Sequence, residues 1–127
     1  MPTYKKRNES SIVTSVGKYL QLLENNGKIS FWTRMQAGTV QFQRNSKWQS
    51  MRMGREGIAD ILAFTHYNCD TLNGEMSQIF WIECKLYSKQ SESQVVFQSI
   101  VEKCGHYYWV IHNLDELEAK FKSIGVL

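Results

Sequence analysis

Charged residues lie inside two short apolar runs of this sequence, and this pattern constrains the fold most strongly. Residues 78–87 are rich in aromatic and β-branched side chains, which predicts a strand. Period-two alternation puts Glu83 and Lys85 on one face of that strand. Residues 58–64 form a second apolar run with a single acid, Asp60, directly after a glycine-containing bend. If the two strands pair, Asp60 and Glu83 converge at one end of a sheet.

Two carboxylates on adjacent strands suit a hard divalent cation. Mg²⁺ takes oxygen ligands, keeps several waters and usually binds one or two protein carboxylates. The backbone carbonyl of Cys84 supplies a further oxygen, and Lys85 can stabilise negative charge on a phosphate. This set of groups is suited to phosphodiester hydrolysis. The alternative is structural, because an acid and a base two residues apart on a strand can form a solvated surface pair of little energetic consequence.

The sequence resembles the PD-(D/E)XK nuclease superfamily, and within it the small phage-type VRR-NUC (virus-type replication-repair nuclease) domains. The matching segments span nearly the whole chain: Gly57-Ile58-Ala59-Asp60, Ile82-Glu83-Cys84-Lys85, residues 91–97, residues 105–110, and a helix opening at Glu9. The family's usual proline before the first aspartate is Ala59 here. Proline supplies no ligand, so this departure leaves the chemistry intact.

The resemblance implies a role for each matching polar residue. Asp60 and Glu83 are expected to bind Mg²⁺ or Mn²⁺ together with the Cys84 carbonyl. Lys85 is expected to be the catalytic lysine, Gln94 to point into the site from a helix, and Glu9 to add a further acid.

Two of these residues also have a structural interpretation. Ser91 and Gln94 have the spacing of a capping box, in which Gln94 reaches back to the helix terminus. Glu9 can serve as a first-turn acid that complements a helix dipole. The sequence leaves both interpretations open.

The chain has a net charge of +3, too modest to indicate nucleic-acid binding, but its basic residues are unevenly distributed. Those expected to contact DNA phosphates are Arg44, Lys47, Arg52 and Arg55. We interpret residues 43–53 as a mobile DNA-contacting loop in which Trp48 stacks on a base. Packing against a second subunit and a solubilising surface are the alternatives.

Hydrophobic periodicity predicts a single α/β domain, residues 1–127, with a mixed central sheet flanked by helices in the order α-β-β-β-α-β-α. The resemblance makes this a restriction-endonuclease-like core. The expected elements are a helix at 9–24, strands at 29–35, around Asp60 and around Glu83, a helix at 91–103, a strand at 107–111 and a final helix from Asn113 or Asp115.

Three details of this prediction can be tested by a structure. The segment 40–42 is a candidate continuation of the first strand into a hairpin, and the polar segment 65–77 is expected to be a long connection. The strand 107–111 is expected to be central and parallel to the Glu83 strand. The second helix is expected to bury Phe97, Ile100, Val101 and Cys104.

These features predict a Mg²⁺- or Mn²⁺-dependent DNA endonuclease, and the resemblance implies nicked, branched or junction DNA as its substrate in phage replication, repair or recombination. A homodimer is expected, because one small cleft cuts both strands most easily as a symmetric pair. The alternative is a non-catalytic nucleic-acid-binding module with the same fold. Widely spaced cysteines and the lack of a long apolar run or signal-peptide pattern predict a cytoplasmic protein, in the host cell if phage-encoded, without membrane association.

Overall fold

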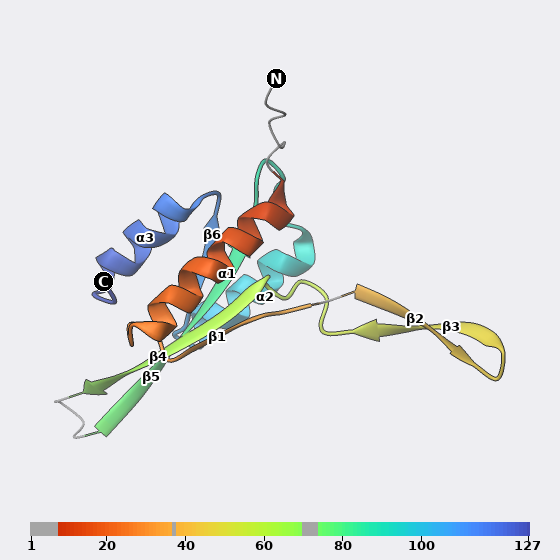
Figure 1. Cartoon of the computed structure of the whole chain (residues 1–127), viewed down its shortest axis with the longest axis horizontal. Coiled ribbons are helices and arrows are strands. Elements are labelled where there is room, and N and C mark those ends of the chain that lie inside the picture. Colours follow the sequence, from red (N-terminus) through yellow and green to blue (C-terminus); the bar gives the residue numbers. More distant parts are fainter. Residues whose placement is uncertain (1–7, 37, 70–73) are drawn as a thin grey trace.

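A four-stranded mixed sheet forms the centre of the computed structural model, which describes residues 8–36, 38–69 and 74–127. In chain order the elements are α1 (Glu9–Asn25), β1 (Phe31–Arg34), β2 (Gly38–Arg44), β3 (Lys47–Met53), β4 (Ile61–Cys69), β5 (Gly74–Cys84), α2 (Glu92–Lys103), β6 (Tyr107–Ile111) and α3 (Leu114–Ser123) (Figure 1). The strand order of the central sheet is β1-β4-β5-β6, antiparallel except for the parallel pair β5 and β6. The mixed α/β class and the parallel pairing are therefore confirmed.

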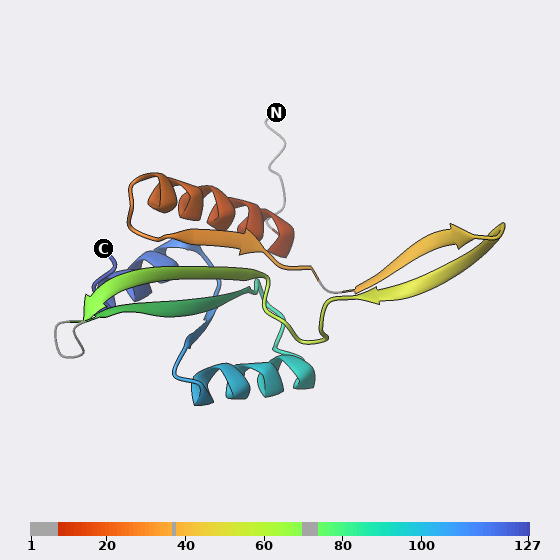
Figure 2. The same ribbon diagram turned by 90° about the horizontal axis from the view of Figure 1, so that it is seen from below.

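Helices cover both faces of the central sheet (Figure 2). The inward residues of α1 and α3 pack with Phe80, Ile82 and Cys84 of β5 in the larger core cluster. The opposite face of β5 carries Trp81, which makes an edge-on contact with Phe97 of α2 at a centroid distance of 4.9 Å. β5 therefore alternates its side chains between two apolar layers, as its period-two pattern predicts.

The β4–β5 pair is longer than the sequence indicates. Its register runs from Ile61 opposite Ile82 to Cys69 opposite Gly74, so most of residues 65–77 is strand and the predicted long connection is wrong. This part of the pair extends past the helices (Figure 1), and its described residues His66 and Ser77 are exposed, so polar residues are compatible with strand structure there. Within this predicted connection, residues 70–73 lie outside the described residues.

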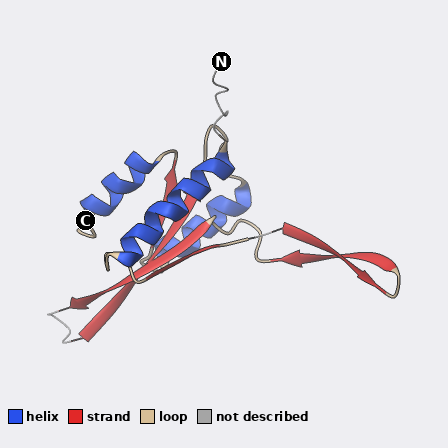
Figure 3. Ribbon diagram, viewed as in Figure 1, coloured by secondary structure: helices blue, strands red, loops and turns tan. Residues whose placement is uncertain are grey.

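Residues 43–53 form no loop in the structure, which corrects the prediction. β2 and β3 make a separate two-stranded antiparallel sheet, the β2–β3 ribbon, which projects away from the central sheet (Figure 3). Its turn residues Asn45 and Ser46 have φ angles of 52° and 62°. Positive φ at both positions is typical of a type I′ turn, whose twist matches that of the flanking strands. The ribbon also adds two strands to the predicted element order.

Two further predictions are corrected. The strand 107–111 was expected to be central, but β6 is an edge strand of the described sheet. Tyr108 and Ile111 are nevertheless buried, because helices cover both faces of β6. In α2, Val101 is buried and Phe97 partly buried, whereas Ile100 and Cys104 are exposed. Helical periodicity locates an apolar stripe but does not reveal how much of it the sheet covers. None of the helices in the described ranges has the length and apolar composition needed to cross a bilayer.

Candidate active site

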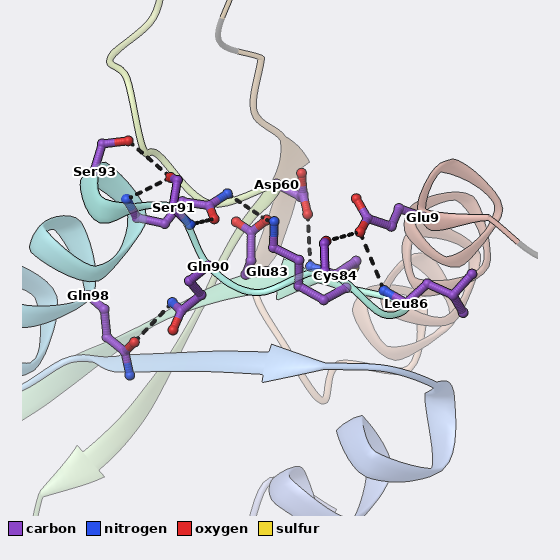
Figure 4. A network of polar contacts seen from close by, with 12 residues as sticks. Glu9, Asp60, Glu83, Cys84, Leu86, Gln90, Ser91, Ser93 and Gln98 are labelled. Carbon is purple, nitrogen blue, oxygen red and sulfur yellow. Dashed lines mark hydrogen bonds and ion pairs between the residues drawn. The ribbon is translucent and has the colours of Figure 1, made fainter.

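The two carboxylates predicted to converge do so. Asp60 directly precedes β4, and Glu83 is the penultimate residue of β5. Since Ile61 pairs with Ile82, the register places Asp60 across from Glu83 at one end of the sheet. Asp60 Oδ2 accepts a 2.8 Å hydrogen bond from the backbone N–H of Cys84 (Figure 4). This bond fixes the Asp60 side chain against the end of β5.

Glu83 is buried, with only 3% of its surface exposed. Its Oε1 accepts a 3.1 Å hydrogen bond from Gln94 Nε2 and lies 3.7 Å from Lys85 Nζ. Its Oε2 is buried and has no hydrogen-bond partner among the described residues. The interpretation of Glu83 and Lys85 as a solvated surface pair is therefore wrong.

Burial raises the pKa of Glu83 above its ordinary value, and the negative charge of Asp60 raises it further, while Lys85 opposes the shift. A buried carboxylate without full compensation is costly, and a bound cation is one of the few groups that relieves this cost. The unpartnered Oε2 therefore fits a metal ligand. In the described part of the chain no three Asp, Glu, His or Cys side chains form a metal-binding group, so the candidate protein ligands are these two carboxylates.

Gln94 makes both contacts predicted for it, one to the terminus of its helix and one into the site. Ser91 is the N-cap of α2, its Oγ accepts from the Gln94 backbone N–H over 3.3 Å, and Gln94 Oε1 accepts from the Ser91 N–H over 2.9 Å. The amide group of the same side chain donates to Glu83. The capping box thus orients the Gln94 amide, and the amide holds Glu83.

Glu9 lies at the start of α1 and contacts the loop that follows β5. Its Oε1 accepts hydrogen bonds from Ser88 Oγ at 2.6 Å and from the Leu86 N–H at 3.5 Å. The Ser88 bond is the main cause of the lowered pKa of Glu9. The charge of Glu9 also contributes to the raised pKa of Glu83. Glu9 is therefore within electrostatic reach of the site, and its direct contacts fix the loop carrying Lys85.

The four predicted DNA-contacting residues do not gather at the carboxylates. Arg44 and Lys47 flank the ribbon's turn, and Arg55 follows the ribbon. Arg52 lines a depression of about 460 Å³ beside the site. Among its other lining residues are Asp60, Gln94 and Arg34.

Arg34 lines the site, whereas the sequence interpretation counted it only among the unevenly distributed basic residues and did not assign it to the site. It ends β1 opposite Ile61, one residue from Asp60. The pairing of β1 with β4 reveals this position, and a basic residue at a strand end would have been the only signal in the sequence.

Gly57 joins the Asp60 side of the site to the Gln94 side. Its φ is +85°, and a Cβ atom at this position would lie 2.4 Å from the backbone carbonyl carbon and oxygen of Ser93. The loop before Asp60 therefore presses directly on the first turn of α2. Only glycine combines this backbone conformation with this close approach.

Comparison with protein-family models, with curated proteins and with solved structures finds no match to this chain.

Proposed function

We propose that this chain is a Mg²⁺- or Mn²⁺-dependent endonuclease with a restriction-endonuclease-like core that hydrolyses phosphodiester bonds in DNA. The observation that carries the proposal is the buried Glu83 carboxylate, whose Oε2 is unpartnered among the described residues beside Asp60 and Lys85. The buried Glu83, the partly buried Asp60 and a lysine held at one sheet end destabilise the fold unless they serve a ligand. This cost favours a catalytic site over a structural cluster.

Asp60, Glu83 and the Cys84 carbonyl would hold the metal ion. In an extended strand the N–H and C=O of one residue point to the same neighbour, so the Cys84 N–H bond to Asp60 supports a carbonyl directed to the same side. A bound Mg²⁺ supplies Lewis acidity toward phosphate and lowers the pKa of a coordinated water.

The surrounding side chains have separate tasks in this proposal. Lys85, whose side chain is 12% exposed, faces the carboxylates and donates to a phosphate oxygen as charge develops there. Gln94 donates to Glu83 Oε1, so Oε2 would remain available to bind the ion. Glu9 fixes the loop that follows Lys85 through Ser88.

The proposed substrate is nicked, branched or junction DNA, in the cytoplasm of a phage-infected cell. A single cleft in a chain of 127 residues cuts one strand at a time, so paired cuts require two copies.

The exposed face of α2 supports a homodimer. Six of its seven exposed residues, Glu92, Val95, Val96, Ser99, Ile100 and Lys103, are symmetric about the midpoint between residues 97 and 98, and Glu102 is the exception. An antiparallel pair of α2 helices therefore places Glu92 against Lys103 of the second copy twice, with Val95 opposite Ile100 between them. Self-complementarity of this kind is what a two-fold interface requires.

A non-catalytic DNA-binding module with the same fold is the competing function. Such a module gains nothing from the carboxylates of Asp60 and Glu83 facing an anionic ligand, and it should bind DNA more tightly once they are neutralised.

The test is cleavage of labelled linear, nicked, flapped and four-way-junction DNA in Mg²⁺ or Mn²⁺. Asp60→Asn and Lys85→Ala should each lower the rate by about 10²-fold or more. Lys89→Ala is the matched control, because Lys89 is an exposed lysine on the same loop, and it should retain the rate. DNA binding without cutting by the wild-type protein and both site variants would establish the binding module instead.

A further inference from the structure

The β2–β3 ribbon makes no strand pairing with the central sheet, and its side chains are almost fully exposed. Phe42 alone among the ribbon's residues is partly buried. An isolated two-stranded ribbon is marginally stable in water. A seven-residue arm of this kind, roughly 24 Å long, is therefore a candidate binding element. Its two faces and its charge indicate which class of ligand it binds.

Cross-strand partners share a face, so the register divides the ribbon's side chains into two sets. One face carries the apolar residues Val40, Phe42, Met51 and Met53, with Val40 directly opposite Met51. The same face also carries Gln49 and, beside the turn, Arg44 and Lys47. The other face carries Thr39, Gln41, Gln43, Trp48, Ser50 and Arg52.

The second face, called here the polar face, has the side chains that recognise base edges. Glutamine amides donate and accept at adenine, arginine donates to guanine, and hydroxyl groups bond to either. In the described part of the chain, the side chains of Gln41, Gln43 and Ser50 make no hydrogen bond that would occupy them. Their donors and acceptors face solvent.

The charge around the ribbon favours a polyanion. From Asn25 to Arg55 the sequence contains six Lys or Arg residues and no Asp or Glu, whereas the whole chain has a net charge of only +3. Arg44 and Lys47 flank the turn at the far end. At the near end Arg52 lies 3.4 Å from Glu56, with both side chains mostly exposed, so solvent screens this pair and phosphate can displace it.

The ribbon is also continuous with the candidate active site. Arg52 of β3 and Gly38 of β2 line the same depression as Asp60 and Gln94. A duplex whose backbone enters that depression extends along the ribbon, and a two-stranded ribbon fits the major groove of B-DNA.

We propose that the β2–β3 ribbon inserts its polar face into a groove of duplex DNA and recognises base edges beside the cleaved bond. This inference rests on the proposed nuclease function and adds sequence preference to it. The apolar face then points away from the bases, and Arg44 and Lys47 contact phosphates.

The experiment measures binding of a labelled duplex by fluorescence anisotropy in EDTA, where no metal-dependent hydrolysis occurs, and selection of bound sequences from a randomised duplex pool. Gln41→Ala with Gln43→Ala should abolish the sequence preference of the selected pool. Gln49→Ala is the matched control, because it removes the same amide from the opposite face of the same ribbon, and it should leave the preference unchanged.

A second pair of variants tests the phosphate contacts. Arg44→Ala with Lys47→Ala should weaken binding to all sequences and lower the slope of log affinity against log salt by about two. Lys120→Ala with Lys122→Ala removes the same charge from α3 and should leave that slope unchanged. Circular dichroism of each variant checks that the fold is retained.

Three results would overturn the inference. The first is unchanged affinity and an unchanged salt slope in the Arg44 and Lys47 variant, and the second is a pool selected by the wild-type protein that shows no sequence preference. The third is a ribbon variant that alters sedimentation but not DNA binding, which would show that the ribbon binds a second copy of the chain. Because binding is measured without metal, failure of the ribbon is distinguishable from failure of the nuclease proposal, which the cleavage assay tests separately.

Discussion

Gln94 Nε2 lies 3.1 Å from Glu83 Oε1 and connects the first turn of α2 to the end of β5. The bond satisfies one oxygen of a buried carboxylate, while the other oxygen has no partner among the described residues. The polar centre of the molecule is therefore incomplete as an internal hydrogen-bond network. Ligand binding at this point would complete it.

Glu83→Gln should stabilise the metal-free protein at high pH. The folded-state pKa of Glu83 is raised, so the wild-type protein loses stability as pH rises from the unfolded-state value of about 4.3 toward the folded-state value. The unfolding free energy of the variant should exceed that of the wild-type protein by about 1–3 kcal/mol at pH 8, and by less than half of that at pH 5. Thermal melts in EDTA at both pH values measure the difference.

The same melts give a control with metal. Mg²⁺ should raise the melting temperature of the wild-type protein at pH 8 and should raise that of Glu83→Gln much less, because the variant lacks the anionic ligand. An equal Mg²⁺ effect on both proteins would contradict the assignment of Glu83 as a ligand.

Gln94→Ala and Ser91→Ala separate the two roles of Gln94. Each removes part of the capping box and should cost about 1 kcal/mol of unfolding free energy. Only Gln94→Ala also frees Glu83 Oε1, so it should reduce cleavage by a further 10-fold or so relative to Ser91→Ala. Urea denaturation and single-turnover cleavage measure the two effects, and equal rates would leave Gln94 with the capping role alone.

Gly57→Ala should destabilise the fold by about 3 kcal/mol or more, because it combines positive φ with a clash against backbone atoms. Gly27→Ala is the matched control. Gly27 also has positive φ, +73°, but nothing lies within 4 Å of its Cβ position, so the cost should be about 1 kcal/mol. Similar losses in both variants would show that conformational strain, and not the contact with Ser93, dominates at Gly57.

Lys103→Glu should weaken the proposed dimer, since it places two acids at each end of the antiparallel α2 pair. Glu92→Lys combined with Lys103→Glu restores opposite charges and should restore association. Sedimentation velocity at several protein concentrations measures both. A double variant as monomeric as the single one would argue against pairing through this face.

The sequence predicts the site better than it predicts the periphery. Asp60 and Glu83 lie within apolar runs of the sequence, where a charge is costly, so their positions are easily recognised, and the expected convergence depended on the two strands pairing. The convergence of Gln94 on Glu83 was expected from resemblance and is found in the structure. What these residues bind stays a proposal.

The β2–β3 ribbon escaped prediction for a physical reason. Its strands bury almost nothing and polar residues interrupt their apolar face, so the alternation is weak in the sequence, and its Asn45-Ser46 turn lacks the glycine that usually signals a two-residue hairpin. Arg34 escaped for a different reason, because only the pairing of β1 with β4 brings it beside Asp60. The sequence of a strand as short as the four-residue β1 does not reveal which strand it pairs with.

The register of β4 against β5 makes the candidate site an all-or-none structure. Side chains alternate along a strand, so a slip of one residue would turn Glu83 from the α2 face toward the apolar layer beneath α1 and Asp60 would lose its partner. No graded sliding connects the two arrangements. Damage to this end of the sheet would therefore leave a mixture of copies that keep the Asp60 and Glu83 pair and copies that lack it, without a continuous range of carboxylate separations between them.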